Sequence, residues 1–406
     1  MSNKQRLIVI GNGMAGIRTI DELLKLSPEK YDITVFGAEP YCNYNRIMLS
    51  PVLAGDKTIE QIILHDFQWY QDKNIQLHTS KAVIGIDPIH QTVIADDGSE
   101  ANYDKLILAT GSNPIILPLK GKDLDGVITF RDIDDVNIMI EAAKIYKKAV
   151  VIGGGLLGLE AANGLMIQGM DVTVVQRGSI LMNQQLDQVA SDLLQAELEQ
   201  KGLTFLTDYE TTEFIGRDRV EKVLFSNGIE IEADLVVVAV GIHPNIALAQ
   251  QSGIMCKRGV LVDERLKTYS KNIYAVGECV QYGDETYGLV APLYKQAKAC
   301  AAQLVDGDAT YQSTETVTKL KVTGINLFSV GDFNGDQACE ILTHLDPSGH
   351  IYKKLVLKEN KIIGILLYGD ISDGNWYFSL LSKKTDVSAM RENIIFGKQK
   401  VNENLL

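Results

Sequence analysis

Two short glycine-rich stretches have the residue types and spacing best suited to chemistry. They are Gly11–Gly16 (GNGMAG) and Gly153–Gly158 (GGGLLG), and both have the form G-x-G-x-x-G. Each follows an apolar run and precedes apolar residues at helical spacing, which predicts a strand, a tight turn and a helix. In such a unit the first glycine permits the turn, the second lets the backbone approach a pyrophosphate, and the third allows the helix to pack closely on the strand. The amides that open the helix then face an anion.

The residues that follow the next strand of each unit differ in charge. In the first unit, strand Ile33–Phe36 leads to Glu39, whose carboxylate can accept hydrogen bonds from ribose hydroxyls. In the second unit, strand Asp171–Val175 leads to Gln176 and Arg177, which lack that acid and offer a cation for a 2′-phosphate. Two fingerprints in one chain predict two separate dinucleotides, and the obvious pair is FAD with NADH or NADPH.

Two further strand ends carry groups that suit a bound cofactor. An apolar strand from Lys105 ends at Ala109 and is followed by Thr110 and Gly111, which can place backbone amides and a hydroxyl beside the cofactor. A later strand closes on Gly277 and Glu278, whose carboxylate can accept a hydrogen bond from a ribityl hydroxyl.

The polar and aromatic loop Pro40–Pro51 has the texture of a binding loop. Its arginine, Arg46, pairs with a diphosphate in one interpretation and is an ordinary surface arginine in the other. Cys42 is a candidate redox thiol, but the sequence around it offers neither a resolving cysteine nor an activating His or Lys.

The chain that must position these residues has the composition of an ordinary globular protein. It contains 46% hydrophobic and 22% charged residues. A chain of 406 residues is too long for one hydrophobic core, so we expect two or three domains. The net charge of −13 argues against nucleic acid or an anionic membrane as the main partner. We expect a cytoplasmic protein, because no apolar run is long enough to span a bilayer and an early strand leaves no room for a signal peptide. Five scattered cysteines without a CxxC pair predict neither a metal site nor a disulfide scaffold.

The character of the sequence changes from about Tyr311. Alternating segments there predict a small antiparallel sheet with strands at Lys319–Val322, Asn326–Val330, Glu340–Leu345, Tyr352–Leu357 and Lys361–Tyr368, followed by a helix near Asn375–Ser382. The polar tail, Arg391–Leu406, is expected to be loosely held.

With these motifs in this order, the chain resembles a pyridine-nucleotide flavoprotein reductase of the glutathione-reductase fold. More narrowly, it is similar to the FAD-binding N-terminal part of the NAD(P)H nitrite reductase large subunit and to the electron-transfer subunit of assimilatory nitrate reductase, with rubredoxin reductases as further relatives. The similarity covers most of residues 1–390. The stretches that carry it are Ile10–Arg18, Asn43–Ser50, Gly153–Ala162, Gln185–Ala190, Tyr274–Cys279 and Tyr287–Lys298.

The resemblance implies an α/β protein with two Rossmann-like dinucleotide-binding domains and a small α+β C-terminal domain. The implied division is a discontinuous FAD-binding domain (1–115 and 244–310), an NAD(P)-binding domain (116–243), a C-terminal interface domain (311–390) and the tail (391–406).

The resemblance also assigns residues to the two cofactors. Val83 would touch the adenine of FAD, Arg131 would approach the flavin, and Glu160 would stand beside the nicotinamide as the catalytic candidate. The remaining implied FAD contacts are Gly11, Gly13, Met14, Ala15, Gly16, Glu39, Arg46, Ala109, Thr110, Gly111, Gly277, Glu278 and Val290. The implied NAD(P) contacts are Gly153, Gly155, Leu156, Gly158, Gln176, Arg177 and Gly241.

The implied activity is electron transfer from NAD(P)H through FAD to a separate protein, such as a nitrate or nitrite reductase catalytic subunit, a ferredoxin or a rubredoxin. Related chains continue into cysteine-rich iron–sulfur domains, and this one stops at Leu406 without those cysteines, so we expect it not to reduce nitrite by that route itself. Related reductases also often have a lysine where Pro51 stands, and many flavoproteins of this fold have Asp in place of Glu278. Two alternatives stay open, namely a flavin-bearing redox sensor and a Cys42-dependent peroxidase or disulfide reductase.

Overall fold

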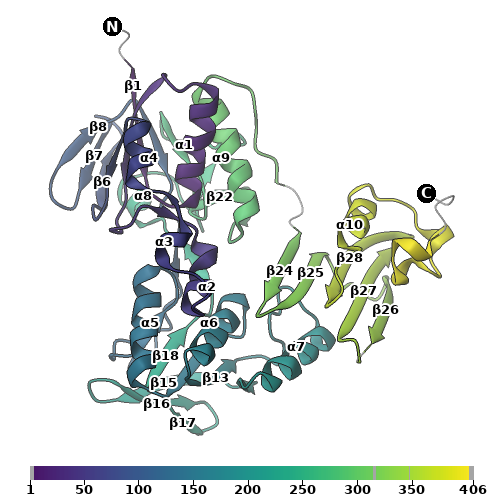
Figure 1. The fold of residues 1–406 in the computed structure, drawn as a ribbon. Helices are drawn as coiled ribbons and strands as arrows, with labels where there is room; N and C mark the ends of the chain where they lie inside the picture. The colour runs from purple at the N-terminus through teal and green to yellow at the C-terminus, as the bar shows by residue number, and fades with distance from the viewer. Residues whose placement is uncertain (1–3, 314–316, 347, 402–406) are drawn as a thin grey trace.

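The structure is a computed structural model that describes residues 4–313, 317–346 and 348–401. Three parts are visible in Figure 1: an upper body with purple and green elements, a lower teal body, and a yellow-green part beside them. The chain enters the upper body, crosses to the lower body, returns to the upper body, and then forms the third part. This arrangement confirms the predicted α/β class with two Rossmann-like domains and a small C-terminal domain.

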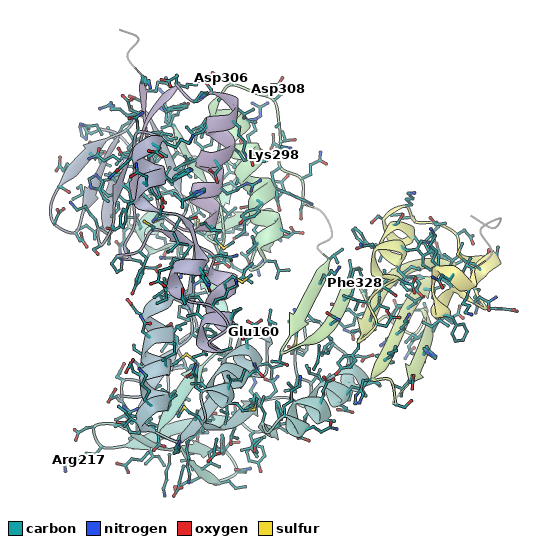
Figure 2. The ribbon with its side chains drawn as sticks, viewed as in Figure 1. Glu160, Arg217, Lys298, Asp306, Asp308 and Phe328 are labelled. Atoms are coloured by element: carbon teal, nitrogen blue, oxygen red, sulfur yellow. The ribbon has the colours of Figure 1, made fainter. Side chains whose placement is uncertain are left out.

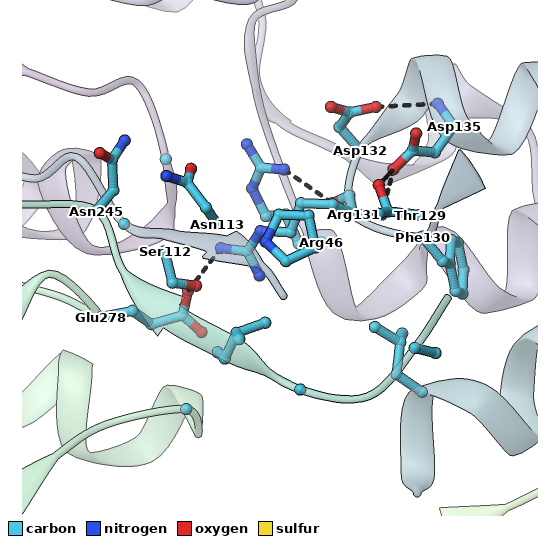
Figure 3. Close-up of a pocket in the computed structure, with 18 of the residues that line it drawn as sticks. Arg46, Ser112, Asn113, Thr129, Phe130, Arg131, Asp132, Asp135, Asn245 and Glu278 are labelled. Atoms are coloured by element: carbon cyan, nitrogen blue, oxygen red, sulfur yellow. Dashed lines mark hydrogen bonds and ion pairs between the residues drawn. The ribbon is translucent and has the colours of Figure 1, made fainter. Parts of the chain in front are cut away.

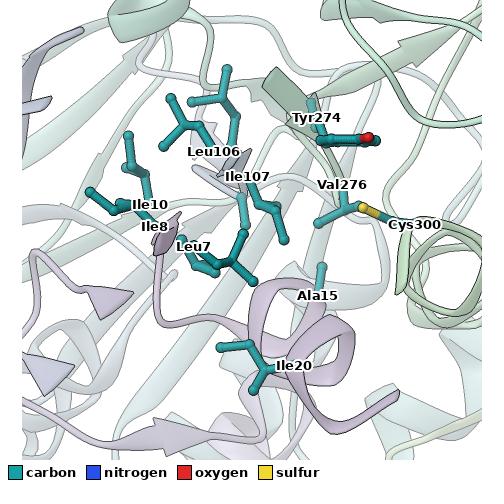
Figure 4. Packing of buried hydrophobic residues seen from close by; sticks show 14 of the residues in the cluster. Leu7, Ile8, Ile10, Ala15, Ile20, Leu106, Ile107, Tyr274, Val276 and Cys300 are labelled. Carbon is teal, nitrogen blue, oxygen red and sulfur yellow. The ribbon is translucent and has the colours of Figure 1, made fainter. Parts of the chain in front are cut away.

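A five-stranded parallel sheet forms the centre of the upper body. Its strand order is β21-β9-β1-β2-β5. The strands read as nearly continuous apolar runs because helices cover the sheet, as expected for a buried parallel sheet. Figure 4 shows this core, with Leu7, Ile107 and Ile20 among its packed side chains. The elements are β1 (Gln5–Ile10), α1 (Met14–Leu26), β2 (Tyr31–Phe36), β5 (Ile75–His78), β9 (Lys105–Leu108), β21 (Ile273–Ala275) and α9 (Val290–Leu304).

Smaller elements surround this sheet. An antiparallel sheet contains β6 (Val83–Asp87), β7 (Thr92–Ala95) and β8 (Glu100–Asn102). A mixed sheet contains β20 (Val260–Val262), β22 (Val280–Tyr282) and β23 (Glu285–Thr286), with β20 parallel and β23 antiparallel to β22. The predicted binding loop folds into β3 (Asn43–Tyr44), η1 (Arg46–Met48) and α2 (Leu49–Leu53). The remaining elements are α3 (Ile59–Ile62), β4 (Ile63–His65), α4 (Phe67–Asp72) and α8 (Ala247–Gln251).

The lower body repeats the architecture of the upper one. Its parallel sheet has the order β11-β18-β12-β13-β14, and a three-stranded antiparallel sheet, β15-β16-β17, packs beside it. The chain crosses between the two bodies at β10 (Ser112–Pro114) and β19 (Ile242–Pro244), which pair antiparallel. The elements are β11 (Val127–Thr129), α5 (Ile133–Ile145), β12 (Lys148–Ile152), α6 (Leu156–Ile167), β13 (Asp171–Gln176), α7 (Gln188–Gln200), β14 (Thr204–Thr207), β15 (Thr211–Gly216), β16 (Val220–Phe225), β17 (Glu230–Glu232) and β18 (Leu235–Val238).

The third part is the antiparallel sheet expected from the sequence, in the order β24-β25-β28-β27-β26. One face packs on α10, and the other packs on α7 of the lower body, where Tyr352 and Lys354 both donate to the carboxylate of Asp187 at 2.9 Å. The elements are β24 (Thr318–Val322), β25 (Ile325–Gly331), β26 (Glu340–Asp346), β27 (Ile351–Lys358), β28 (Lys361–Tyr368) and α10 (Gly374–Ser382).

The expectation of a loose tail from Arg391 onward is wrong for the residues up to Val401. Short helical turns η2 (Ser388–Met390), η3 (Ile394–Phe396) and η4 (Lys398–Lys400) follow α10. Ile394 and Val401 are buried, and the Tyr377 hydroxyl donates to the Ile394 carbonyl at 2.6 Å. A few apolar side chains therefore hold this segment on the C-terminal sheet, while residues 402–406 lie outside the described part of the chain.

We propose domain limits near the crossing strands β10 and β19 and in the linker after α9, with the segment up to Val401 belonging to the C-terminal part. Among the described residues, no helix has the length and apolar character needed to cross a membrane.

Candidate functional site

A large cavity lies between the upper and lower bodies. Its volume is about 1870 Å³, and it is lined by both glycine-rich turns and by the ends of the strands that precede them. Ligands of open α/β sheets bind outside the carboxyl ends of the strands, so both sheets aim their binding edges into one space.

The first glycine turn has the geometry of a pyrophosphate cradle. Gly11 has φ +113°, and a Cβ there would lie 2.1 Å from the carbonyl oxygen of Ala109. A Cβ on Gly16 would lie 2.7 Å from the Gly11 carbonyl oxygen, which explains the close helix–strand contact. A Cβ on Gly13, by contrast, would meet no protein atom within 4 Å. Open space beside the first turn of α1 is where an anion would sit.

The second glycine turn repeats this geometry. Gly153 has φ +117° and a Cβ there would lie 2.3 Å from the Ala239 carbonyl oxygen, while a Cβ on Gly158 would lie 1.9 Å from the Gly153 carbonyl oxygen. Gly155, at the start of α6, again faces open space. Both turns therefore fit a dinucleotide, with the two sites opening into the same cavity.

Two of the residues that are predicted to hold the first dinucleotide also interact with each other. The Arg46 guanidinium pairs with the Glu39 carboxylate, and the Tyr44 hydroxyl donates to the same carboxylate at 2.7 Å. Arg46 also donates to the Arg131 carbonyl at 3.0 Å, and burial raises the pKa of Tyr44. The side chains that are predicted to bind the ribose and the diphosphate of FAD thus belong to one hydrogen-bonded network beside the first glycine turn.

A second ion pair stands in the same cavity, and Figure 3 shows its residues. Arg131 donates to the Glu278 carboxylate at 2.6 Å, and the Ser112 hydroxyl donates to the same oxygen at 2.7 Å. Asp135 accepts from the Arg131 backbone N–H at 2.6 Å, and burial, together with the nearby charge of Asp132, raises its pKa to about 6. Ser112 directly follows the predicted cofactor contacts Thr110 and Gly111, whereas Asp135 had no predicted role.

The helix that follows Glu278 aims its N-terminus at the same region. Helix α9 starts at Val290, and its N-cap residue, Leu289, supplies no side-chain hydrogen bond, so the first-turn amides have no capping acceptor. Gly277, with φ +96°, donates its N–H to the buried Gln296 of α9 at 2.8 Å. This contact fixes the glycine–carboxylate turn against the helix.

Glu160 lines the cavity from α6 of the lower body, and Figure 2 labels it there. Its partner comes from α2, which packs against α5 and α6. The Ser50 hydroxyl on that helix donates to the Glu160 carboxylate at 2.6 Å. Burial raises the pKa of Glu160, and the hydrogen bond from Ser50 partly offsets that effect. No local pattern could have revealed a pairing between residues so far apart in sequence.

Cys42 lies in the wall of the cavity, but its surroundings disfavour the thiolate. Burial raises the pKa of its thiol to about 11, and among the described residues all five cysteines are free. A reactive thiol needs a lowered pKa. The geometry therefore weighs against the Cys42-dependent alternative.

The structure brings most of the predicted site residues to this one cavity. Three glycines, Gly16, Gly158 and Gly277, stand behind its wall and act in packing or backbone geometry. Lys319 of β24, which had no predicted role, also lines the cavity and brings the C-terminal part to it. The predicted residues in the wall are Gly11, Gly13, Met14, Ala15, Glu39, Arg46, Val83, Ala109, Thr110, Gly111, Arg131, Gly153, Gly155, Leu156, Glu160, Gln176, Arg177, Gly241, Glu278 and Val290.

The sequence is similar to curated proteins over almost its whole length. It is 50% identical over 386 residues to the nitrite reductase [NAD(P)H] of Bacillus subtilis (strain 168), covering 95% of this chain and 48% of that protein. It is 44% identical to the assimilatory nitrate reductase electron transfer subunit of the same organism, covering 97% of this chain and 51% of that protein. The chain thus spans about half the length of these two relatives.

A solved structure matches over almost the whole of both chains. It is the NADH:rubredoxin oxidoreductase from Clostridium acetobutylicum, with a TM-score of 0.81 and 27% identity, covering 95% of this chain and 97% of that one. Residues 317–385 match the C-terminal domain of rubredoxin NAD+ reductase.

Residues 5–303 match the family model of pyridine nucleotide-disulphide oxidoreductases. This family uses FAD and NAD(P)H, which confirms the predicted cofactors and the predicted class of NAD(P)H-dependent flavoprotein oxidoreductase. The chain belongs to the pyridine nucleotide-disulphide oxidoreductase family.

Proposed function

We propose that this chain takes electrons from NAD(P)H into FAD and passes them to a separate protein acceptor in the reduction of nitrate or nitrite. The observation that carries the proposal is the shared cavity, into which both glycine cradles open. The curated relatives named for nitrite and nitrate reduction support the choice of pathway. We further propose that the protein works in the cytoplasm.

The glycine turns hold the two pyrophosphates in this proposal. The amides that open α1 and α6 face the open space beside Gly13 and Gly155, and the helix dipoles favour the negative charge there. Glu39 offers its carboxylate to ribose hydroxyls, and Arg46 bridges it to the Arg131 carbonyl. When bound, the flavin supplies hydride acceptance and the release of electrons.

The protein's own contribution to the chemistry is orientation and electrostatics. The uncapped first turn of α9 directs its amides into the cavity and stabilises negative charge there. The Glu160 carboxylate, held by Ser50, positions the nicotinamide end of the second dinucleotide. No proton-transferring side chain is required for hydride transfer.

Anaerobic stopped-flow reduction tests this function. The purified protein should be yellow, and reduced nicotinamide should bleach it. Glu160→Ala should retain the flavin but slow its reduction by roughly tenfold or more, because a displaced reactant loses rate steeply. The matched control, Cys42→Ser, should reduce at the wild-type rate. A colourless protein that refuses FAD, or a yellow one that neither nucleotide bleaches, contradicts the proposal.

A second candidate is a reductase for a small rubredoxin-type protein. The nearly full-length match to the Clostridium structure and the C-terminal domain match favour it. Presenting the NAD(P)H-reduced protein with a rubredoxin, a ferredoxin and an iron–sulfur nitrite reductase fragment separates the two. Fast reduction of rubredoxin alone supports this candidate, whereas fast reduction of the nitrite reductase fragment supports the first.

A further inference from the structure

The end of β13 is the place where a dinucleotide site of this fold distinguishes NADH from NADPH. Strand β13 runs parallel to β12, with Ile152 paired to Val175, so the residues after Val175 lie beside the second glycine turn. An acid here binds the ribose hydroxyls of NADH, and an arginine accommodates the 2′-phosphate of NADPH. In this chain the two residues concerned are Gln176 and Arg177.

Gln176 is committed to the protein itself. Its Oε1 accepts from the Gly154 backbone N–H at 2.9 Å, and its Nε2 donates to the Ile180 carbonyl at 3.1 Å. It therefore stabilises the glycine turn and brings no negative charge to the ribose position. A 2′-phosphate would meet no carboxylate at the position where an NADH-specific site has one.

Arg177 is exposed and lines the cavity. Within the described part of the chain it has no hydrogen bond, ion pair or ring contact. The other two arginines of the cavity wall are neutralised, since Arg46 pairs with Glu39 and Arg131 pairs with Glu278. Two acids follow the neighbouring strand β14. Asp208 donates its backbone N–H to the Gly178 carbonyl at 3.3 Å, and Glu210 lines the cavity. Among the described residues, no ion pair joins either of them to Arg177.

We propose that Arg177 receives the 2′-phosphate of NADPH and that this chain uses NADPH in preference to NADH. The inference rests on the proposed function and adds to it the identity of the electron donor. A guanidinium binds a phosphate through charge-assisted, bidentate hydrogen bonds, and an arginine without an internal partner need not break an existing ion pair to do so. Because the site is exposed, the preference for NADPH should weaken as salt is raised.

The kinetic test compares kcat/KM for NADPH and NADH in the FAD-loaded protein. Arg177→Ala should lower kcat/KM for NADPH by roughly ten- to a hundredfold and change the value for NADH by less than about twofold. The control is Arg217→Ala, which removes another exposed arginine at the turn between β15 and β16, away from Glu160 in Figure 2. It should change neither value.

A binding test gives a second readout that needs no turnover. By calorimetry, adenosine 2′,5′-bisphosphate should bind the FAD-loaded wild type at least about tenfold more tightly than ADP, and Arg177→Gln should remove that difference. A wild type that prefers NADH, or an Arg177 variant that weakens both nucleotides equally, overturns the inference while leaving the proposed function intact. A flavin that neither nucleotide reduces overturns the proposed function instead.

Discussion

The two nucleotide cradles share a backbone but differ in how their charges are arranged. In both, the first glycine has a positive φ and leaves no room for a Cβ beside a neighbouring carbonyl oxygen, and the second faces open space. Around the first cradle, Arg46 with Glu39 and Arg131 with Glu278 form closed ion pairs. Around the second, Glu160 is held by a serine hydroxyl and the exposed Arg177 has no partner among the described residues.

This difference indicates how each ligand is handled. Charges that are already paired and part-buried form a rigid frame, which suits a cofactor that stays bound. An exposed arginine without a partner can bind and release a phosphate without disrupting a network, which suits a substrate that exchanges in every cycle. The glycine pattern thus tells where a dinucleotide binds, and the surrounding charges tell how it is used.

The largest effect is expected from adding a side chain to the first glycine turn. In Gly11→Ala the new Cβ would lie 2.1 Å from the Ala109 carbonyl oxygen at a φ of +113°, so the backbone must move. We expect a loss of about 4 kcal/mol or more in the free energy of unfolding, or failure to fold. Gly98→Ala is the matched control, because Gly98 also has a positive φ but open space around it, and it should cost only about 1–2 kcal/mol. Equal losses in denaturant titrations would show that the close contact is unimportant.

The lower body, which contains the second cradle, also contacts the C-terminal sheet through Asp187, and the next prediction tests that contact. The Asp187 carboxylate caps α7 by accepting from the Ala190 N–H at 3.1 Å and also accepts from Tyr352 and Lys354. Asp187→Ala should lower the free energy of unfolding by about 3–5 kcal/mol, because it leaves the buried Lys354 without a counter-charge.

Two milder variants separate the roles of Asp187. Asp187→Asn retains a good helix cap but not the charge, and Tyr352→Phe removes one hydrogen bond at a cost of about 1 kcal/mol. Hydrogen exchange in β27 reports directly on the C-terminal sheet. Unchanged protection of β27 in Asp187→Ala would mean that the sheet is held by its apolar contacts alone.

Much of this architecture could be predicted from short-range patterns. Both glycine turns, the strands before them and the five C-terminal strands have local signatures, and the structure contains them all. Helix α5 was missed although Asp132 caps it by accepting from the Asp135 N–H, and two more acids stand in its first turn. The capping signal was present in the sequence, but it was weaker than the glycine patterns on either side.

The pairing of charges could not be predicted. Ser50 with Glu160 and Arg131 with Glu278 join residues more than a hundred positions apart, and only the fold brings them together. The hydrogen bond between the Tyr377 hydroxyl and the Ile394 carbonyl could not be predicted either. It holds a tail that has too few apolar residues to show a pattern in the sequence. The sequence supplied the candidate residues, and tertiary contacts determined which of them are neutralised.

A pair of milder glycine substitutions should affect the two cradles separately. A Cβ on Gly13 or Gly155 would meet no protein atom within 4 Å, so both alanine variants should fold with near wild-type stability. Gly13→Ala should weaken FAD binding by about tenfold, because the new methyl group enters the space for the pyrophosphate. Gly155→Ala should stay yellow and raise the KM for NADPH by a similar factor. Loss of flavin from Gly155→Ala would contradict the assignment of the two cradles.

The smallest effect concerns Asp135, which holds the Arg131 backbone where the two cradles meet. Its pKa is raised to about 6, so the folded state binds its proton more tightly than the unfolded state does. The stability that this gives is present below about pH 4, the ordinary range for Asp, and is lost as pH rises through about 6.

Asp135→Asn removes this titration because an amide does not ionise in this pH range. Its oxygen can still accept the hydrogen bond from the Arg131 N–H. The free energy of unfolding of the wild type should therefore fall relative to that of the variant between pH 4 and pH 7, by on the order of 1 kcal/mol once solvent screening is allowed for. Urea titrations of both proteins at several pH values measure the difference. A constant difference across this range, or one that changes with the opposite sign, would show that the carboxylate is charged without penalty and that this junction is more open to solvent than its contacts indicate.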